Sequence, residues 1–332
     1  MILLLSTLLS FVPALLCAAF VYWIDRYEKE PRLLVGAVFF WGAVVAVLGA
    51  VVSQLVLGGV VYLATGSEAA ADLVGTTVLA PLTEESLKGF AVLLVFLFLR
   101  RDFDSLLDVM VYAGTVALGF AATENVLYLA SAGEESGVEG VLTLFVLRGI
   151  LGAWDHAFYT SFIGIGLAAS RYSRSTTVRW LAPPAGWAVA VGAHALHNGL
   201  ATGSSERPEL GVAMFLIDWS GWLFIGGVIL VALLREGKLL AVELAEEVNQ
   251  GSLTLDQYRS ATSTWSRAAI RLRALAAGRL AATRRFYQLC AELAHKKRQL
   301  ALFGDEGGNA RAIEDLRAEM RLLSPQALAD RT

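Results

Sequence analysis

The feature that most constrains this 332-residue chain is a series of seven long apolar runs. They cover residues 2–22, 34–63, 72–99, 106–131, 140–170, 180–202 and 211–234. Each reaches about 20 residues, which is the length that a helix needs to cross a bilayer. Hydrophobic residues form 56% of the chain and charged residues 17%, which is more apolar than a soluble core requires. The pattern predicts an all-α fold, a polytopic membrane helix bundle of about seven spans.

Two of the runs, 72–99 and 140–170, are long enough to contain an irregular join. Pro81 is one place for such a break, because proline removes a helical hydrogen bond. The N-terminal run lacks the positive region of a signal peptide, and Leu16 directly before Cys17 makes a poor lipoprotein cleavage site. We therefore expect this run to be a retained helix. The two cysteines, Cys17 and Cys290, suggest no disulfide framework.

Basic residues alternate between the connections of the predicted spans. Segments 23–33, 100–105 and 171–179 and the tail after Arg235 are rich in Lys and Arg. Segments 64–71, 132–139 and 203–210 together contain only Arg207. Because basic connections stay on the cytoplasmic side, the pattern predicts an N-terminus outside and a C-terminus in the cytoplasm.

The composition divides the chain into residues 1–235, a transmembrane domain, and 236–332, a cytoplasmic helical tail. The first part has 12 Lys and Arg against 18 Asp and Glu, and the second has 15 against 12. The tail is too mildly basic to indicate nucleic-acid binding.

Within the tail, residues 237–248 should continue the last span, and Ser252 or Thr254 can cap a helix that begins near Leu255. A loop at 304–310 before an apolar pattern at 312–323 predicts a helical hairpin, suited to packing or oligomerisation. His295 is expected to be solvated. The oligomeric state stays open.

Ionisable residues also occur inside the apolar runs, where they are costly and usually face a bundle interior. They are Glu84, Glu85, Lys88, Glu124, Asp155, His156, His194, His197 and Asp218. Counted from the cytoplasmic ends of five spans that run in alternating directions, they lie roughly 20–27 Å above that face at about 1.5 Å per residue. Scattered structural groups would not share one level, so the counting predicts a common polar site.

The spacing within each run places these groups on shared helical faces. Residues three or four apart are neighbours on a helix. The pairs with this spacing are Glu84–Lys88, Glu85–Lys88, Phe120–Glu124, His194–His197 and His194–Asn198. Asn125 follows Glu124 and can donate to a neighbouring carboxylate.

Histidines and carboxylates are ligands for zinc, and a catalytic zinc keeps one position for water. A buried glutamate beside such a site suits a general base. The sequence contains no HExxH, so a metal site would have to be assembled from separate helices.

At these residues the chain resembles the PrsW family of bacterial intramembrane proteases, within the wider superfamily of CAAX-processing and bacteriocin-protecting membrane proteases. The EExxK motif is matched by residues 84–88, and FxxxEN by residues 120–125. A histidine near the fifth span matches His156, and a histidine with Asn four residues later matches His194 and Asn198. The charged segment 25–32 also looks like the one after the family's first helix.

The resemblance implies a multi-pass protein of the bacterial plasma membrane that cleaves a membrane-anchored protein, and members are linked to regulated cleavage of anti-sigma factors. We expect Glu84 or Glu85 to activate water, with Lys88 tuning them. His156, His194 and Glu124, with His197 less certain, are expected to hold zinc or position the carbonyl. Asn198 is expected to bind the oxyanion. Phe120, Asn125, Asp155 and Asp218 are expected to support these groups.

Other interpretations of the same residues stay open. Glu84, Glu85 and Lys88 could form a structural ion pair, and the histidines could make interhelical hydrogen bonds. Glu124 could pair with Lys88 or Arg148. An ion- or proton-coupled transporter also uses midplane carboxylates and histidines, although the odd span count and the lack of an internal repeat count against it. A non-catalytic scaffold would not need such convergence.

Overall fold

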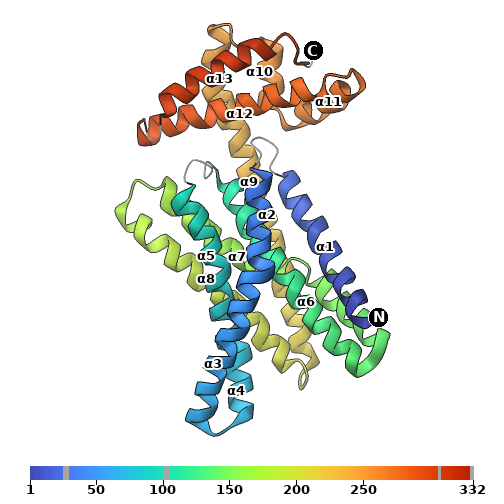
Figure 1. Cartoon of the computed structure of the whole chain (residues 1–332). Coiled ribbons are helices and arrows are strands. Elements are labelled where there is room, and N and C mark those ends of the chain that lie inside the picture. Colours follow the sequence, from blue (N-terminus) through green and yellow to red (C-terminus); the bar gives the residue numbers. More distant parts are fainter. Residues whose placement is uncertain (25–29, 100–104, 306–307, 330–332) are drawn as a thin grey trace. The chain divides into compact units, whose positions relative to one another are not determined.

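A computed structural model describes residues 1–24, 30–99, 105–305 and 308–329, and within them all regular structure is helical (Figure 1). Four helical segments in these ranges are long and apolar enough to cross a membrane: Ile2–Ile24, Arg32–Thr65, Leu106–Tyr172 and Pro208–Asn249. Five of the seven predicted spans fall within them. Runs 72–99 and 180–202 are largely helical but lie outside these segments, so the count of seven stays a prediction.

The chain divides into two compact units within one long helix, between Val228 and Ile229. The first unit contains α1 (Ile2–Ile24), α2 (Arg32–Phe40), the π-helix η1 (Trp41–Ala46), α3 (Val47–Thr65), α4 (Glu68–Val74), the π-helix η2 (Gly75–Leu79), α5 (Ala80–Phe98), α6 (Leu106–Leu144), the π-helix η4 (Phe145–Leu151), α7 (Asp155–Tyr172), α8 (Thr176–Gly203) and the first part of α9 (Pro208–Asn249). Basic residues Arg26, Lys29, Arg100 and Arg101, on which the predicted orientation partly depends, lie outside the described residues.

The centre of the first unit is the first half of α6, where every residue from 107 to 122 is buried. It packs against α1, α2, η1, α5 and α7. A Cβ on Gly119 would lie 2.2 Å from the Phe39 carbonyl oxygen, and one on Gly42 would lie 2.0 Å from the Val116 carbonyl oxygen. Glycine at these two positions therefore lets the backbone of α2 and η1 approach α6 closely. The buried first half of α6 is therefore the central element of the unit, and the polar residues described below lie beside it.

Runs 72–99 and 140–170 both contain the irregular join that we expected, and run 34–63, where none was expected, contains one as well, the π-helix η1. The π-helix η2 ends directly before Ala80 and Pro81, where the proline cannot donate to the carbonyl four residues back. The π-helix η4 is followed by a turn at 152–154, after which α7 begins at Asp155. The expected connection 132–139 is mostly helix, because the chain reverses at Gly137 alone, with φ 65°. These breaks place Glu84 and His156 shortly after a change of helix geometry.

The second unit contains the end of α9 with α10 (Leu255–Thr262), α11 (Thr264–Ala276), α12 (Leu280–Phe303) and α13 (Asn309–Leu323). Thr254 rather than Ser252 caps α10, since its side chain accepts from the Gln257 amide. Leu240 and Leu244 of α9 join Phe286, Leu289 and other apolar residues in one core. The location of this unit in the cytoplasm stays a prediction.

The prediction that His295 is solvated is wrong. His295 is 2% exposed, and its Nε2 contacts the carboxylate of Glu236. The sequence around it, AELAHKKRQL, is polar, but His295 lies four residues after Ala291, so helical spacing turns it to the side of α12 that carries Ala291 into the core.

Candidate active site

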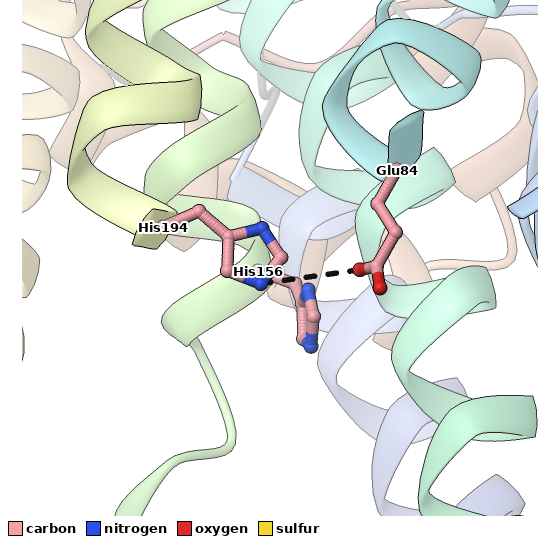
Figure 2. A group of neighbouring side chains, drawn as sticks. All are labelled: Glu84, His156 and His194. Atoms are coloured by element: carbon pink, nitrogen blue, oxygen red, sulfur yellow. Dashed lines mark ion pairs between the residues drawn. The ribbon is translucent and has the colours of Figure 1, made fainter. Parts of the chain in front are cut away.

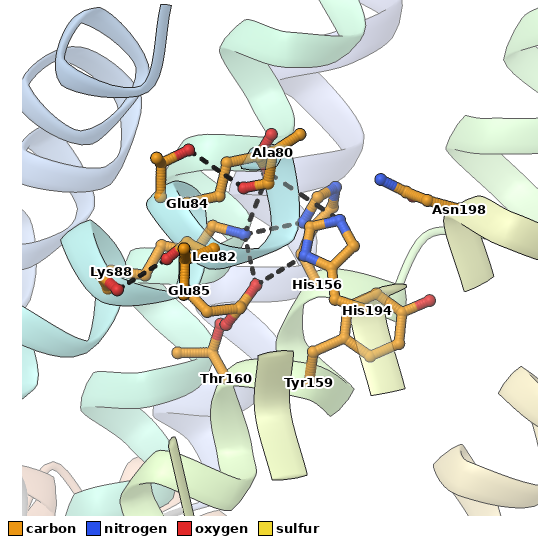
Figure 3. A network of polar contacts seen from close by, with 12 residues as sticks. Ala80, Leu82, Glu84, Glu85, Lys88, His156, Tyr159, Thr160, His194 and Asn198 are labelled. Atoms are coloured by element: carbon orange, nitrogen blue, oxygen red, sulfur yellow. Dashed lines mark hydrogen bonds and ion pairs between the residues drawn. The ribbon is translucent and has the colours of Figure 1, made fainter. Parts of the chain in front are cut away.

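The two glutamates and the lysine of α5 are buried together in the first unit (Figure 3). Lys88 Nζ lies 2.7 Å from Glu85 Oε1 and 3.6 Å from Glu84 Oε2. It also lies 3.0 Å from His156 Nδ1 and 4.2 Å from the centre of the Phe120 ring. One ammonium therefore serves two carboxylates, so ionisation of both would leave one negative charge uncompensated.

The two glutamates differ in how fully they are bonded. Glu85 accepts from Lys88 and from the Thr160 hydroxyl at 2.8 Å, and it contacts His194 Nδ1 at 3.0 Å. Glu84 accepts from the Gln54 amide through Oε1 at 3.2 Å, whereas its buried Oε2 has no hydrogen-bond partner. Glu85 is thus a structural link between α5, α7 and α8, and Glu84 keeps an oxygen available.

A second difference between the two glutamates is a cavity of about 1120 Å³ that lies against Glu84. Its polar lining includes Gln54, Glu84, Glu124, His156, His194 and Asn198, and its apolar lining comes from α3, α6 and α9. Neither Glu85 nor Lys88 lines it. A substrate or water in this cavity would therefore meet Glu84 and not Glu85.

Two histidines from different helices converge on Glu84 (Figure 2). The rings of His156 and His194 lie 5.2 Å apart and nearly perpendicular, at 89°. His194 Nε2 lies 3.9 Å from Glu84 Oε2. One ligand atom from each of the three residues lies within 4.8 Å of the others.

This set fits a catalytic metal by two observations. Two histidines and one glutamate are a donor set of zinc hydrolases, and the buried Glu84 Oε2 accepts no hydrogen bond, with Lys88 Nζ 3.6 Å and His194 Nε2 3.9 Å away. His156 Nδ1, however, already contacts the Lys88 ammonium. An ion held by His156 through that nitrogen would have to replace this contact.

Glu124 lies outside the group and is paired with Arg148. Arg148 Nη2 lies 2.6 Å from Glu124 Oε2, and its Nε donates to Asn125 Oδ1 at 2.8 Å. The same Glu124 oxygen lies 2.8 Å from His156 Nε2. Of the open alternatives for Glu124, the structure shows the pair with Arg148 and a contact that orients His156.

A second group joins Asp155, His197 and Asp218, whose ligand atoms also lie within 4.8 Å of one another. His197 Nδ1 lies 2.8 Å from Asp218 Oδ2, and the Trp222 indole donates to Asp155 Oδ1 at 3.1 Å. The Tyr159 hydroxyl donates to Asp218 Oδ1 at 3.1 Å. Each of the three therefore has a hydrogen-bond partner, and Asp218 is bonded through both oxygens, whereas Glu84 is bonded through Oε1 alone.

Asn198 lines the cavity, but its amide donates to the Thr76 carbonyl of η2 at 2.9 Å. Sequence reasoning missed Gln54, Tyr159 and Thr160. The last two lie three and four residues after His156, so helical spacing places them near its face and could have found them. Gln54 comes from α3, and no motif signals it.

The fold and the site define a helical protein with apolar segments long enough to cross a membrane and a buried glutamate–histidine centre. Residues 30–233 match the PrsW family intramembrane metalloproteases, and the chain belongs to this family. All the candidate site residues lie within the matched range, which confirms the resemblance read from the motifs. The family and the apolar helices together place the protein in a membrane.

Named relatives agree with this assignment. The chain is 31% identical over 179 residues to Protease PrsW of Bacillus subtilis (strain 168), which covers 51% of this chain and 71% of that protein. It is 30% identical over 161 residues to Protease PrsW of Geobacillus kaustophilus (strain HTA426), which covers 48% of this chain and 64% of that protein. No solved structure matches the chain.

Proposed function

We propose that this chain is an intramembrane peptidase that cleaves a membrane-anchored protein, with Glu84 as the group that deprotonates the attacking water. The observation that supports this is the buried Glu84 Oε2, which has no hydrogen-bond partner and belongs to the carboxylate that lines the cavity. A water that enters from the cavity and reaches this buried oxygen would donate to it, and a carboxylate within hydrogen-bond reach can take its proton. Glu85 is bonded on both oxygens, so we assign it to positioning.

The neighbouring groups supply charge and orientation. Lys88 brings positive charge beside both glutamates, and Glu85 fixes His194 through Nδ1, which leaves His194 Nε2 directed to Glu84. Asn198 lines the same cavity, and its amide can donate to the carbonyl oxygen of the scissile bond after leaving Thr76. Glu124 orients His156, as ring partners of ligand histidines commonly do.

Of the group Glu84, His156 and His194, the two histidines would hold zinc, and Glu84 would act as the base beside the ion. When bound, the ion would polarise the substrate carbonyl and increase the acidity of water. We exclude Glu124 from the proposed zinc ligands, because its carboxylate is already paired with Arg148. We also exclude His197 from the proposed zinc ligands, because it pairs with Asp218 in the second group.

The test is cleavage of a single-span substrate by purified protein in detergent or vesicles. Wild type should cleave, and Glu84→Gln and His194→Ala should lose cleavage. Chelation should remove bound zinc, measured by elemental analysis, together with the activity. Cleavage undiminished in Glu84→Gln would contradict the assigned base, and activity in metal-free protein would contradict the zinc assignment. Flux of ions or protons that needs Glu84, without cleavage, would favour a transporter, which nothing in the family match supports.

The finer biological assignments are part of the same proposal. The substrate class is a regulatory membrane-anchored protein of the anti-sigma-factor kind. Residues 1–235 form the protease-like domain, and 236–332 form a cytoplasmic tail, with the N-terminus outside. Reaction of single cysteines placed near either end with a membrane-impermeant reagent on intact cells tests this orientation.

A further inference from the structure

We propose that Tyr159 and Asp218 are positioning residues that hold the His194 ring in the orientation that points its Nε2 at Glu84. The proposal rests on the proposed function of Glu84 and His194. It concerns the second polar group, which the proposed reaction does not otherwise use.

The contact between Tyr159 and His194 is a stack of two rings. Their centres lie 4.9 Å apart and their planes differ by 18°. The bond of His194 Nδ1 to Glu85 fixes one atom of the imidazole, but rotation about that contact would swing Nε2 away from Glu84. A flat neighbour parallel to the ring restricts this rotation. Tyr159 therefore determines the plane of His194, while Glu85 determines its position.

Asp218 in turn determines where the Tyr159 ring lies. The Tyr159 hydroxyl donates to Asp218 Oδ1 at 3.1 Å, and His197 holds the other carboxylate oxygen at 2.8 Å. Tyr159 and Asp218 are each 1% exposed, so solvent hardly competes for the bond. The chain of contacts runs from α9 through α7 to α8. Losing the hydroxyl would free the tyrosine ring to tilt and would loosen the face against which His194 stacks.

The same observations argue against a second metal at this group. Asp155, His197 and Asp218 each already have a hydrogen-bond partner, and Asp218 uses both oxygens. Glu84 differs, because one of its buried oxygens has none. We therefore assign the second group to orientation and not to ion binding.

The principal test is Tyr159→Phe, which keeps the stacked ring and deletes only the hydroxyl. Partners that orient a ligand histidine typically change activity about 10- to 100-fold when removed. We expect kcat to fall by that factor with KM within about twofold, since the cavity wall is preserved. The matched control is Tyr112→Phe, which deletes another buried bond from a tyrosine hydroxyl to a carboxylate, that of Glu30, away from the cavity. It should leave kcat unchanged.

Asp218→Asn tests whether the two residues act through one route. If they do, Tyr159→Phe combined with Asp218→Asn should lose no more kcat than the more damaging single change, because coupled residues are not additive. Losses that multiply would contradict the shared route. An unchanged kcat in Tyr159→Phe, or an equal loss in Tyr112→Phe, would overturn the proposal.

A second measurement does not depend on cleavage. His194 is buried, so diethyl pyrocarbonate should modify it slowly in wild type, as mapped by mass spectrometry. The rate at His194 should rise at least about threefold in Tyr159→Phe, as expected when ordering by one hydrogen bond is lost, and stay unchanged in Tyr112→Phe. An equal rate in all three proteins would overturn the positioning role. Faster modification in Tyr159→Phe without cleavage by wild type would keep this role and contradict the proposed peptidase alone.

Discussion

The two compact units each bury acidic side chains, but they treat them differently. In the second unit, Glu247 is fully buried, and both of its oxygens are bonded by Arg317 at 2.8–3.2 Å. Lys297 adds a second partner group, at 3.2 Å from Glu247 Oε1. In the first unit, Glu84 and Glu85 share one ammonium, and one Glu84 oxygen has no hydrogen-bond partner.

The difference separates a structural use of buried charge from a chemical one. A buried carboxylate with enough cations and hydrogen bonds holds helices together and has nothing left to offer. A buried carboxylate that lines a cavity and has one oxygen without a hydrogen-bond partner costs stability, and such a cost is retained at functional sites. The tail cluster is therefore the internal comparison for the candidate active site.

The largest expected effect is on cleavage. Glu84→Gln keeps the shape and the Gln54 contact but cannot take a proton, so cleavage should fall about 10²- to 10⁴-fold. The unfolding temperature in detergent should not decrease, because the uncompensated charge is removed. A marked loss of thermal stability would instead mean that Glu84 is structural, and it would contradict the difference that we draw between Glu84 and Glu247.

The opposite result is expected for Glu247→Gln in the second unit. Removing this charge leaves Arg317 and Lys297 without their buried carboxylate partner, and breaking a buried pair costs about 3–5 kcal/mol. Denaturant unfolding of this unit should show the loss, while cleavage at low temperature stays near wild type. Glu246→Gln is the matched control, since Glu246 is adjacent, also pairs with Lys297, and is 55% exposed in its side chain. It should change stability little.

A smaller effect is expected at high pH from Cys290 in the tail core. Burial raises the pKa of the Cys290 thiol to about 12, against about 8.5 in an unfolded chain. The neutral thiol therefore stabilises the fold fully below about pH 8.5, and the contribution is lost as pH rises above that value. Between pH 8 and pH 10 we expect a loss of about 1–2 kcal/mol from this group. In Cys290→Ala this part of the pH slope should disappear, and a slope identical to wild type would contradict the assignment.

The smallest effect concerns an exposed pair. Arg285 donates two hydrogen bonds to Glu319, which holds the pKa of the Glu319 carboxyl below its ordinary value. The stability from this pair is fully present above the pKa of the Glu carboxyl in the unfolded chain, about 4.3. It is lost as the pH falls through the lower pKa of the folded state. Because the Glu319 side chain is 41% exposed, solvent screening limits the effect to less than about 1 kcal/mol. Urea titrations of wild type and Glu319→Gln at pH 7 and pH 3 measure this contribution. From pH 7 to pH 3, Glu319→Gln should lose less free energy of unfolding than wild type.

Much of the fold and the membership of the site could be predicted from the sequence. Apolar length, helical spacing and the breaks in the two long runs are local properties, so reading along the chain detects them. The common level of Glu84, His156 and His194 followed from counting residues along helices of known rise. Glu84, His156 and His194 indeed meet in the structure, although they lie on three separate helices.

Other features depend on how helices rotate against one another, which no local pattern encodes. The two adjacent glutamates of α5 point about 100° apart, and only packing shows that Glu84 lines the cavity. The pairing of Glu124 with Arg148 and the stacking of Tyr159 on His194 likewise join different helices. His295 was misjudged for the same reason, because its burial depends on α9 and α12 meeting.

By itself, the sequence determined that the chain is a helical membrane protein with acidic and histidine groups at one depth, since hydropathy and helical rise act along one dimension. Only the tertiary structure decided which of those groups keeps an oxygen without a hydrogen-bond partner, because such partners come from residues far apart in the chain. That is why Glu84 and Glu85, neighbours of identical chemistry, are assigned different roles.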